Sequence, residues 1–315
     1  MKTIALLSAS LAAILVPLLP AAPAQALNSI SFVASTGSGA ACTRAAPCHN
    51  LSDAHDATAP GGAINCLDSG PFLGAVITKS ITVDCAGVAA TTSGIFFVGG
   101  AGIVVRFRNL TFDGAFGFGA GIDFVNGAAL FVENCVMQNF NDGPATAIRF
   151  LPANVTGRLY VLDSVISNNG TATGGGGILV QPQGSGSARV ALNRVTLQSN
   201  THGIVADGTG STGPIVVQVR NSVVAGGIGN GIAASTNAGA SFTAFVVDRS
   251  SVLANAGSGI LAQGSGALVH IGGSTVVGNG AGLNAAGGGQ ILSYQNNQAT
   301  GNSFEGGPTG VLAVK

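Results

Sequence analysis

The sequence predicts an all-β protein: a single-domain right-handed parallel β-helix, a solenoid of about nine three-strand rungs with a short N-terminal capping helix. Three observations predict this fold class. A small residue, usually glycine, followed by an aliphatic residue recurs at intervals of 23 to 30 residues. Each repeat holds three short apolar stretches. No segment after the first 26 residues shows the long 3.6-residue period of a crossover helix.

Residues 1–26 are predicted to be a cleaved signal peptide, which would make the protein secreted or periplasmic. Lys2 supplies the positive start, Ile4 to Leu19 is an apolar run, and Ala24 to Ala26 is an A-x-A cleavage motif. The alternative is a membrane anchor, and two prolines at the end of the run argue against it. No later segment has about 18 uninterrupted apolar residues, so no membrane span is expected after cleavage.

Residues 27–60 are predicted to be an opening and capping segment that covers the first rung. Asn50 to Thr58 should form a short helix, with Asn50 as its N-cap and Asp53 three residues later in a capping-box-like pair. One face of this helix is apolar, formed by Leu51, Ala54 and Ala57. The C-terminal end has no comparable cap, only residues 311–314. Self-association through that end is therefore a candidate contact.

All five cysteines lie after the signal peptide, where export permits disulfides. Cys42 and Cys48 are near enough in sequence to close a small loop. Cys66 and Cys85 fall in successive apolar strands, a separation that suits adjacent rungs. Two disulfides are expected, although four cysteines alone allow three connectivities. Cys135 is left over and should be buried as a small apolar residue.

Residues 61–315 are predicted to form the β-helix repeats. The small-aliphatic pairs run from Gly94-Ile95 to Gly310-Val311, and they give an inward column made of Ile122, Ile148, Ile178, Ile204, Ile232 and Ile260. Each strand must then pair in parallel with its counterpart one turn later. A second column at one turn consists of Asn109, Asn134, Asp163, Asn193, Asn221, Asp248, Gly273 and Asn296. Stacked Asn side chains can hydrogen-bond along such a turn.

Outward residues on neighbouring rungs, and two adjacent residues on the capping helix, give three further expectations. Asp123 with Arg149, and Arg108 with Glu133, should form ion pairs at the solvated surface. An outward apolar column consists of Leu179, Val205, Ala233 and Leu261, and it either stays bare or packs under a loop or a partner. His55 and Asp56, adjacent on the capping helix, should point in different directions.

The chain resembles the pectin-lyase-like superfamily of right-handed parallel β-helix proteins, in its bacterial secreted form. The repeats at about 60–315 carry the resemblance, together with strings at 32–39, 48–57, 64–68 and 77–84 that look like the opening rungs of bacterial members. The resemblance implies polysaccharide as the partner. If the protein is an enzyme, it implies a polysaccharide lyase or a glycoside-hydrolase-like activity.

The catalytic motifs of that superfamily are absent from the sequence. The hydrolase strings Asn-Thr-Asp, Asp-Asp, Gly-His-Gly and Arg-Ile-Lys are missing, and so is the lyase string Trp-Ile-Asp-His, since the chain has no Trp. No catalytic residue is therefore predicted. The nearest string, Phe131-Val132-Glu133-Asn134-Cys135, would place Glu133 at a calcium position of the family. Calcium is the only cofactor that the resemblance implies, and no other metal site is expected.

One outward register combines aromatic, basic and acidic residues. Arg106, Phe131 and Tyr160 should lie on three successive rungs, with Arg108 and Glu133 beside them. Stacked aromatics could form a platform for sugar rings, while the arginines hold hydroxyl or carboxylate oxygens. The alternative is an aromatic ladder that stabilises the β-helix without any ligand.

Two functions remain open at this point. The first is an exported β-helix protein that engages extracellular or cell-envelope polysaccharide by binding and, if an acidic cluster exists, cleavage. The second is a non-catalytic surface adhesin or structural solenoid. The formal net charge is zero, so no nucleic-acid partner is expected. Three acidic side chains converging in one groove would favour an enzyme, and a smooth face would favour the structural protein.

Overall fold

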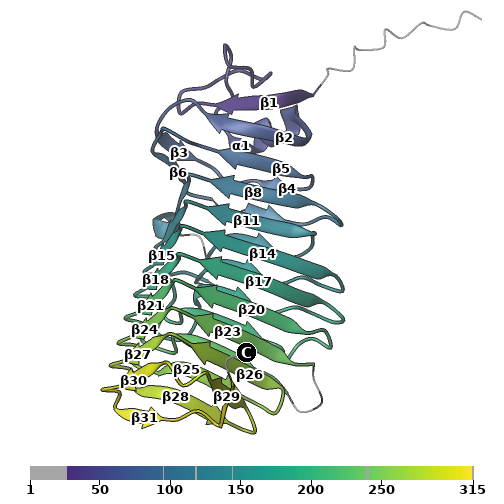
Figure 1. Cartoon of the computed structure of the whole chain (residues 1–315). Coiled ribbons are helices and arrows are strands. Elements are labelled where there is room, and N and C mark those ends of the chain that lie inside the picture. The colour runs from purple at the N-terminus through teal and green to yellow at the C-terminus, as the bar shows by residue number, and fades with distance from the viewer. Residues whose placement is uncertain are drawn as a thin grey trace, which may run out of the picture.

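The protein is a right-handed parallel β-solenoid of about ten turns (Figure 1). The structure, a computed structural model, describes residues 27–313 except 95, 118, 144, 238 and 240. The predicted signal peptide, Ile95 and the last two residues lie outside the described residues. All named strands pair in parallel with the counterpart one turn away, which is the architecture that the resemblance to pectin-lyase-like proteins implies.

Three sheets run along the length of the solenoid, and they are named sheets A, B and C. Sheet A contains β1 (Asn28–Val33), β2 (Thr58–Cys66), β5 (Ile81–Asp84), β8 (Val104–Arg108), β11 (Ala129–Glu133), β14 (Thr156–Leu162), β17 (Ser187–Asn193), β20 (Ile215–Arg220), β23 (Thr243–Asp248), β26 (Ala267–Gly272), β29 (Gln290–Ser293) and β32 (Gly310–Val311). Sheet B contains β3 (Gly70–Phe72), β6 (Ala90–Thr92), β9 (Thr111–Asp113), β12 (Val136–Gln138), β15 (Val165–Ser167), β18 (Thr196–Gln198), β21 (Val223–Ala225), β24 (Ser251–Leu253), β27 (Thr275–Val277) and β30 (Gln298–Thr300). Sheet C contains β4 (Val76–Ile77), β7 (Phe96–Val98), β10 (Ala120–Phe124), β13 (Thr146–Phe150), β16 (Gly176–Val180), β19 (Ile204–Asp207), β22 (Ile232–Ser235), β25 (Ser258–Gln263), β28 (Ala281–Ala286) and β31 (Phe304–Gly306). A single 3₁₀ turn, η1 (Gly114–Phe116), follows β9.

The predicted inward isoleucine column is confirmed. The six isoleucines from Ile122 to Ile260 stack in register through sheet C, and each is no more than 2% exposed. Phenylalanines fill the core in the early turns, where Phe107 contacts Phe112 edge to face and Phe96 at a tilt of 58°. Like side chains stacked along the axis bury the apolar surface of one turn against the next, so the core is continuous from the capped end onward.

The turn after sheet A is only partly as predicted. Asn109, Asn134, Asp163, Asn221 and Gly273 occupy one equivalent turn position, where the backbone is left-handed. Asn193, Asp248 and Asn296 lie one residue away from that position, which Arg194, Arg249 and Gln295 occupy, although Asn221 still donates to Asn193 Oδ1 at 2.9 Å. Asn193 and Asp248 instead end their strands as outward residues. Asn134 donates to Asn109 Oδ1 at 2.6 Å, and Asn109 donates to Asp84 Oδ1 at 2.7 Å.

Two buried polar ladders complete the turns, and neither was predicted. After sheet B, the ladder consists of Asn169, Asn200, Asn255, Asn279 and Asn302, whose side chains bond to one another or to backbone groups of neighbouring turns. After sheet A, a serine ladder consists of Ser164, Ser222, Ser250 and Ser274, each of which accepts a backbone N–H from the preceding turn. Buried polar groups need such partners, so these ladders satisfy the backbone where the chain bends.

The capped end is held by two disulfides and a helix, as predicted. Cys42 is bonded to Cys48 and Cys66 to Cys85, while Cys135 is free and buried. Helix α1 (Leu51–Ala57) lies against β1 and β2 at the purple end of Figure 1. Its inner face buries Leu51 and Ala54, with Ala57 partly buried.

Two details of the helix differ from prediction. Asn50 is the N-cap residue, but its side chain makes no cap hydrogen bond and instead contacts Asp53 Oδ2 at 3.3 Å, so the capping-box pair is wrong. His55 and Asp56 do interact, with Nδ1 and Oδ1 3.0 Å apart. His55 turns inward because its Nε2 accepts the Thr78 N–H.

The other end of the solenoid carries no helix among the described residues. The three sheets end there in the short strands β30, β31 and β32. Phe304 and Val311 are well exposed on them. None of the described helices is both long and apolar enough to cross a membrane.

Candidate functional site

Strands β8, β11 and β14 bring the five predicted site residues together on the outer face of sheet A. Arg106, Phe131 and Tyr160 are direct register partners on successive strands. Arg108 and Glu133 are partners two residues further along the same strands. The inward neighbours Val105, Val132 and Val161 are fully buried. The alternation of the strands therefore fixes the five polar and aromatic side chains outward.

Phe131 is sandwiched between its two register partners. Its ring is stacked on that of Tyr160, with centroids 4.7 Å apart and planes 13° from parallel. On the other side, the guanidinium carbon of Arg106 lies 4.2 Å from the Phe131 centroid. A guanidinium over an aromatic face is attracted by the ring quadrupole. Both faces of Phe131 are therefore covered by the protein itself.

Glu133 holds the two arginines in place. Its Oε1 accepts from Arg106 Nη1 at 2.8 Å, and its Oε2 accepts from Arg108 Nε at 2.6 Å. The expected ion pair of Arg108 with Glu133 is thus confirmed and has a third member. The hydrogen bond to Glu133 raises the pKa of Arg108 above its ordinary value. The trio is partly buried, with 19% of the Glu133 side chain exposed.

The stacking of the Phe131 and Tyr160 rings limits how a sugar could bind to this face. Two rings stacked along the axis cover each other, so they present edges to solvent and not the flat platform that the sequence suggested. One ring face is left over: the side of Tyr160 that faces the next strand, where its register partner is Ala191. Because the Ala191 side chain is small, it leaves space beside this face of the Tyr160 ring.

The borders of this gap carry residues that the sequence analysis missed. Arg158 and Arg189 are register partners on β14 and β17, both exposed, and neither forms an ion pair with any residue that the structure describes. On the other side lie Leu162 and Asn193. Continuing the outward register by one rung beyond Tyr160 would have found Ala191 and Arg189.

Sheet C carries the second predicted ion pair. Arg149 Nη1 lies 3.0 Å from Asp123 Oδ2, which confirms the prediction. Burial raises the pKa of Asp123, and Arg149 only partly offsets this. The other oxygen, Oδ1, is buried without a hydrogen-bond partner among the described residues.

A hollow of about 300 Å³ lies on the same face, and one of its lining residues, Leu179, is the register partner of Arg149. Its floor is the predicted apolar column of Leu179, Val205, Ala233 and Leu261, all of which line the hollow. The loop at residues 174–176 forms one wall, so the column lies partly beside a loop. His202, also in the wall, accepts the Asn230 N–H through Nδ1, and burial lowers its pKa.

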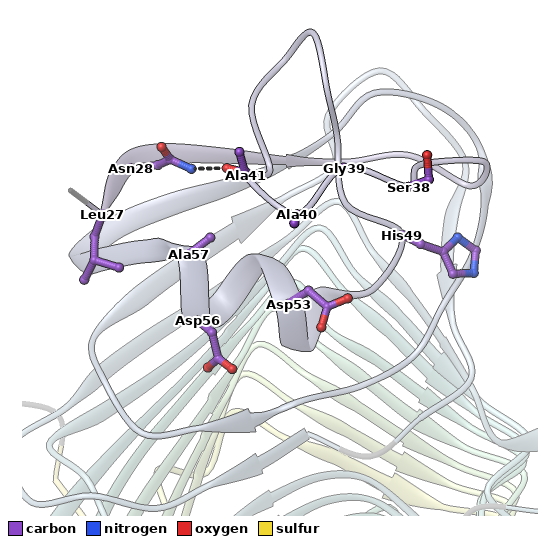
Figure 2. A pocket seen from close by; sticks show the side chains of 10 residues that line it. All are labelled: Leu27, Asn28, Ser38, Gly39, Ala40, Ala41, His49, Asp53, Asp56 and Ala57. Carbon is purple, nitrogen blue, oxygen red and sulfur yellow. Dashed lines mark hydrogen bonds between the residues drawn. The ribbon is translucent and has the colours of Figure 1, made fainter. Parts of the chain in front are cut away.

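A wider hollow of about 590 Å³ lies at the capped end, between α1 and residues 38–41 (Figure 2). Figure 2 shows Asp53 and Asp56 projecting from the helix, while His49 points away on the far side. The three side chains do not converge on one point. Across the described part of the chain, no group of three His, Cys, Asp or Glu residues is placed to hold a metal ion.

Comparisons with known proteins add the following. No family model and no curated protein sequence matches this chain. Among solved structures, the chain is similar to the crystal structure of pectate lyase Pel9A, with a TM-score of 0.46 and 16% identity, covering 92% of this chain and 82% of that one. At this level of similarity, the assignment of the fold rests on the strand pairing described above.

Proposed function

We propose that the protein is an exported polysaccharide-binding β-helix, and that a sugar ring stacks on the free face of Tyr160 above Ala191. The observation that supports this is the aromatic column that ends in a gap: Phe131 is covered on both sides, whereas Tyr160 is covered on one. Sugar rings have apolar faces and polar rims. Arg158 and Arg189 lie at the edge of the gap, where their unused N–H donors can bond to the polar rim of a sugar ring.

The cluster supports binding better than cleavage. Glycoside hydrolysis requires two carboxyl groups on either side of the scissile bond. On this face both Glu133 oxygens accept from arginines, so the carboxylate acts as a counter-ion within the site. The next carboxylate along its column, Asp84, lies two strands away with Arg108 between them.

Two substitutions separate ligand binding from a purely structural ladder. Tyr160→Ala removes the ring, and Ala191→Phe fills the gap while continuing the ladder. We expect each variant to bind glycan about tenfold more weakly, which corresponds to about 1.4 kcal/mol for a lost stacking contact. The measurement is affinity electrophoresis in gels containing pectate, xylan or chitosan, each with and without calcium. Ala225→Phe, on the outer face of sheet B, is the matched control.

The outcomes are distinct. If the aromatic column only stabilises the fold, Ala191→Phe binds as well as the parent protein and unfolds at the same or a higher temperature. A parent protein that is retarded by none of the polysaccharides would favour the non-catalytic structural solenoid. A requirement for calcium would identify the cofactor that the resemblance implies.

Export is part of the proposal. The apolar run and the Ala24 to Ala26 motif support cleavage near Leu27, and the two disulfides are compatible with an oxidising compartment. Mass spectrometry of protein recovered outside the cytoplasm should find a new N-terminus near Leu27. Recovery of the intact Met1 peptide from that fraction would contradict it.

A further inference from the structure

We propose that the hollow between β1, β2, β5 and the loop closed by Cys42 and Cys48 is a second sugar subsite of the same binding face. The hollow measures about 350 Å³, and Phe32, Arg44, Asn65 and Asp84 are among the residues that line it. The inference rests on the proposed function and names where the glycan continues beyond Tyr160.

The hollow lies on the column that already contains the arginine cluster. Phe32, Asn65 and Asp84 are successive register partners on β1, β2 and β5. Asp84 is in turn the partner of Arg108, which pairs with Glu133. One line of outward side chains therefore joins the hollow to the cluster on β8 and β11.

A disulfide positions the wall of the hollow. Arg44 lies within the short loop that the Cys42–Cys48 bond closes, and both cysteines are buried in the core. The Arg44 guanidinium carbon is thereby held 5.6 Å from the centroid of the Phe32 ring on the first strand. Apart from this ring contact, Arg44 has no partner among the described residues, and its donors remain available.

The floor also has unused hydrogen-bonding groups. Asn65 is half-buried, and its side chain has no hydrogen-bond partner within the described part of the chain. Asp84 uses Oδ1 for Asn109 and for the Ala86 N–H, which leaves Oδ2 without a partner there. A guanidinium, an amide and a carboxylate oxygen thus surround one aromatic ring. Neutral hydroxyl-bearing rings need donors and acceptors of this kind around an apolar contact.

The distance between the two subsites sets the length of the ligand. From β14 to β1 the sheet makes five steps between neighbouring strands, through β11, β8, β5 and β2. At about 4.8 Å a step, this is roughly 24 Å. A single monosaccharide or disaccharide cannot reach both places, whereas an oligosaccharide laid along the axis can. Affinity should therefore increase with chain length until the chain covers both subsites.

The experiment measures this length dependence by isothermal titration calorimetry. The probes are cello-, chito- and galacturono-oligosaccharides, each from the disaccharide to the heptasaccharide. The test variant is Arg44→Ala with Asn65→Ala, which removes both side chains from the hollow and breaks no side-chain hydrogen bond or ion pair among the described residues. The control is Arg249→Ala with Gln198→Ala, which removes an exposed guanidinium that pairs with Asp248 and an exposed amide, both away from the hollow.

We expect the parent and the control to bind longer chains progressively more tightly, and the test variant to stop gaining affinity at about the trisaccharide. For the longest chains the dissociation constant of the variant should be at least about fivefold higher. A variant with the same length dependence as the parent would overturn the subsite while leaving the proposed function intact. A parent that binds none of the three series overturns the proposed function, and the subsite with it.

Discussion

At the scale of single residues, Ile204 tests the direction of the inward column. It is fully buried between Ile178 and Ile232. Ile204→Asp would place an unpaired carboxylate in the core and should lower the free energy of unfolding by at least about 4 kcal/mol. Denaturation followed by circular dichroism measures this. Val223→Asp, on the exposed face of sheet B, should change the free energy of unfolding by less than about 1 kcal/mol. Equal losses of stability in both variants would mean that the Ile204 side chain does not point into the core.

Cys135 is the second residue-scale case. Burial is the main cause that raises the pKa of its thiol to about 12. The thiol should therefore stay protonated and fail to react with iodoacetamide at pH 8, while both disulfides remain closed. Denaturation should expose it to rapid alkylation. Fast reaction in the native protein would show that this part of the core opens.

The raised pKa of Cys135 also predicts how the stability of the protein changes at alkaline pH. A group whose pKa is higher in the folded state contributes stability that is complete below its unfolded value and is lost as pH rises through the folded value. The contribution of Cys135 should thus be intact below pH 9.0 and decrease toward about pH 12. Cys135→Ala should remove this part of the loss of stability at alkaline pH. Unfolding curves of the parent and the variant, compared at pH 8 and pH 11, measure the difference.

At the scale of elements, the two disulfides should differ in their effect on stability. The bond between Cys66 and Cys85 closes a loop with a sequence separation of 19, against 6 for Cys42 and Cys48. Loop-closure entropy then gives about 3 kcal/mol for the longer loop and about 2 kcal/mol for the shorter. Chemical denaturation of the Cys66→Ala, Cys85→Ala and the Cys42→Ala, Cys48→Ala variants compares them. A larger loss from the shorter loop would mean that packing, and not chain entropy, decides the order.

The strands and turns also show which features of the fold could be predicted from the sequence. The period of small-aliphatic pairs was enough to predict parallel strands and the inward isoleucines, and the spacing of the cysteines was enough to predict both disulfides. It could not place the turn residues after β17 and β23, because Asn193 and Asp248 resemble turn formers while Arg194 and Arg249 do not. The left-handed conformation there is imposed by the stacking of neighbouring turns, and this stacking overrides local preference.

The candidate site shows a similar limit. Alternation predicted which five side chains would share a face, and their ion pairs followed from register. The orientation of the Phe131 and Tyr160 rings could not be predicted, since it depends on where the Arg106 guanidinium, held by Glu133, lies against the other face of Phe131. The hollow at Phe32 was missed because it needs a loop to fold back over the first strands, and such a contact leaves no period in the sequence.

At the scale of the whole molecule, the solenoid is a one-dimensional stack in which each turn pairs only with the turns before and after it. The two ends are unequal. One is covered by α1 and cross-linked by two disulfides, whereas the sheets at the other end finish in strands with exposed residues. Local opening should therefore begin at β30, β31 and β32. Hydrogen exchange should find amide protection decreasing from β11 toward β29, and uniform protection would contradict this.

The unequal ends also give the molecule a mechanical direction. A force applied along the chain from the C-terminal side would peel off one turn at a time, because only the outermost turn bears the load. Each turn of about 27 residues should release roughly 90 Å of chain as it extends. The segment between Cys66 and Cys85 should not extend without reduction, because their disulfide carries the load past it. The strands of the candidate site, β8, β11 and β14, should therefore yield after all the turns that follow them.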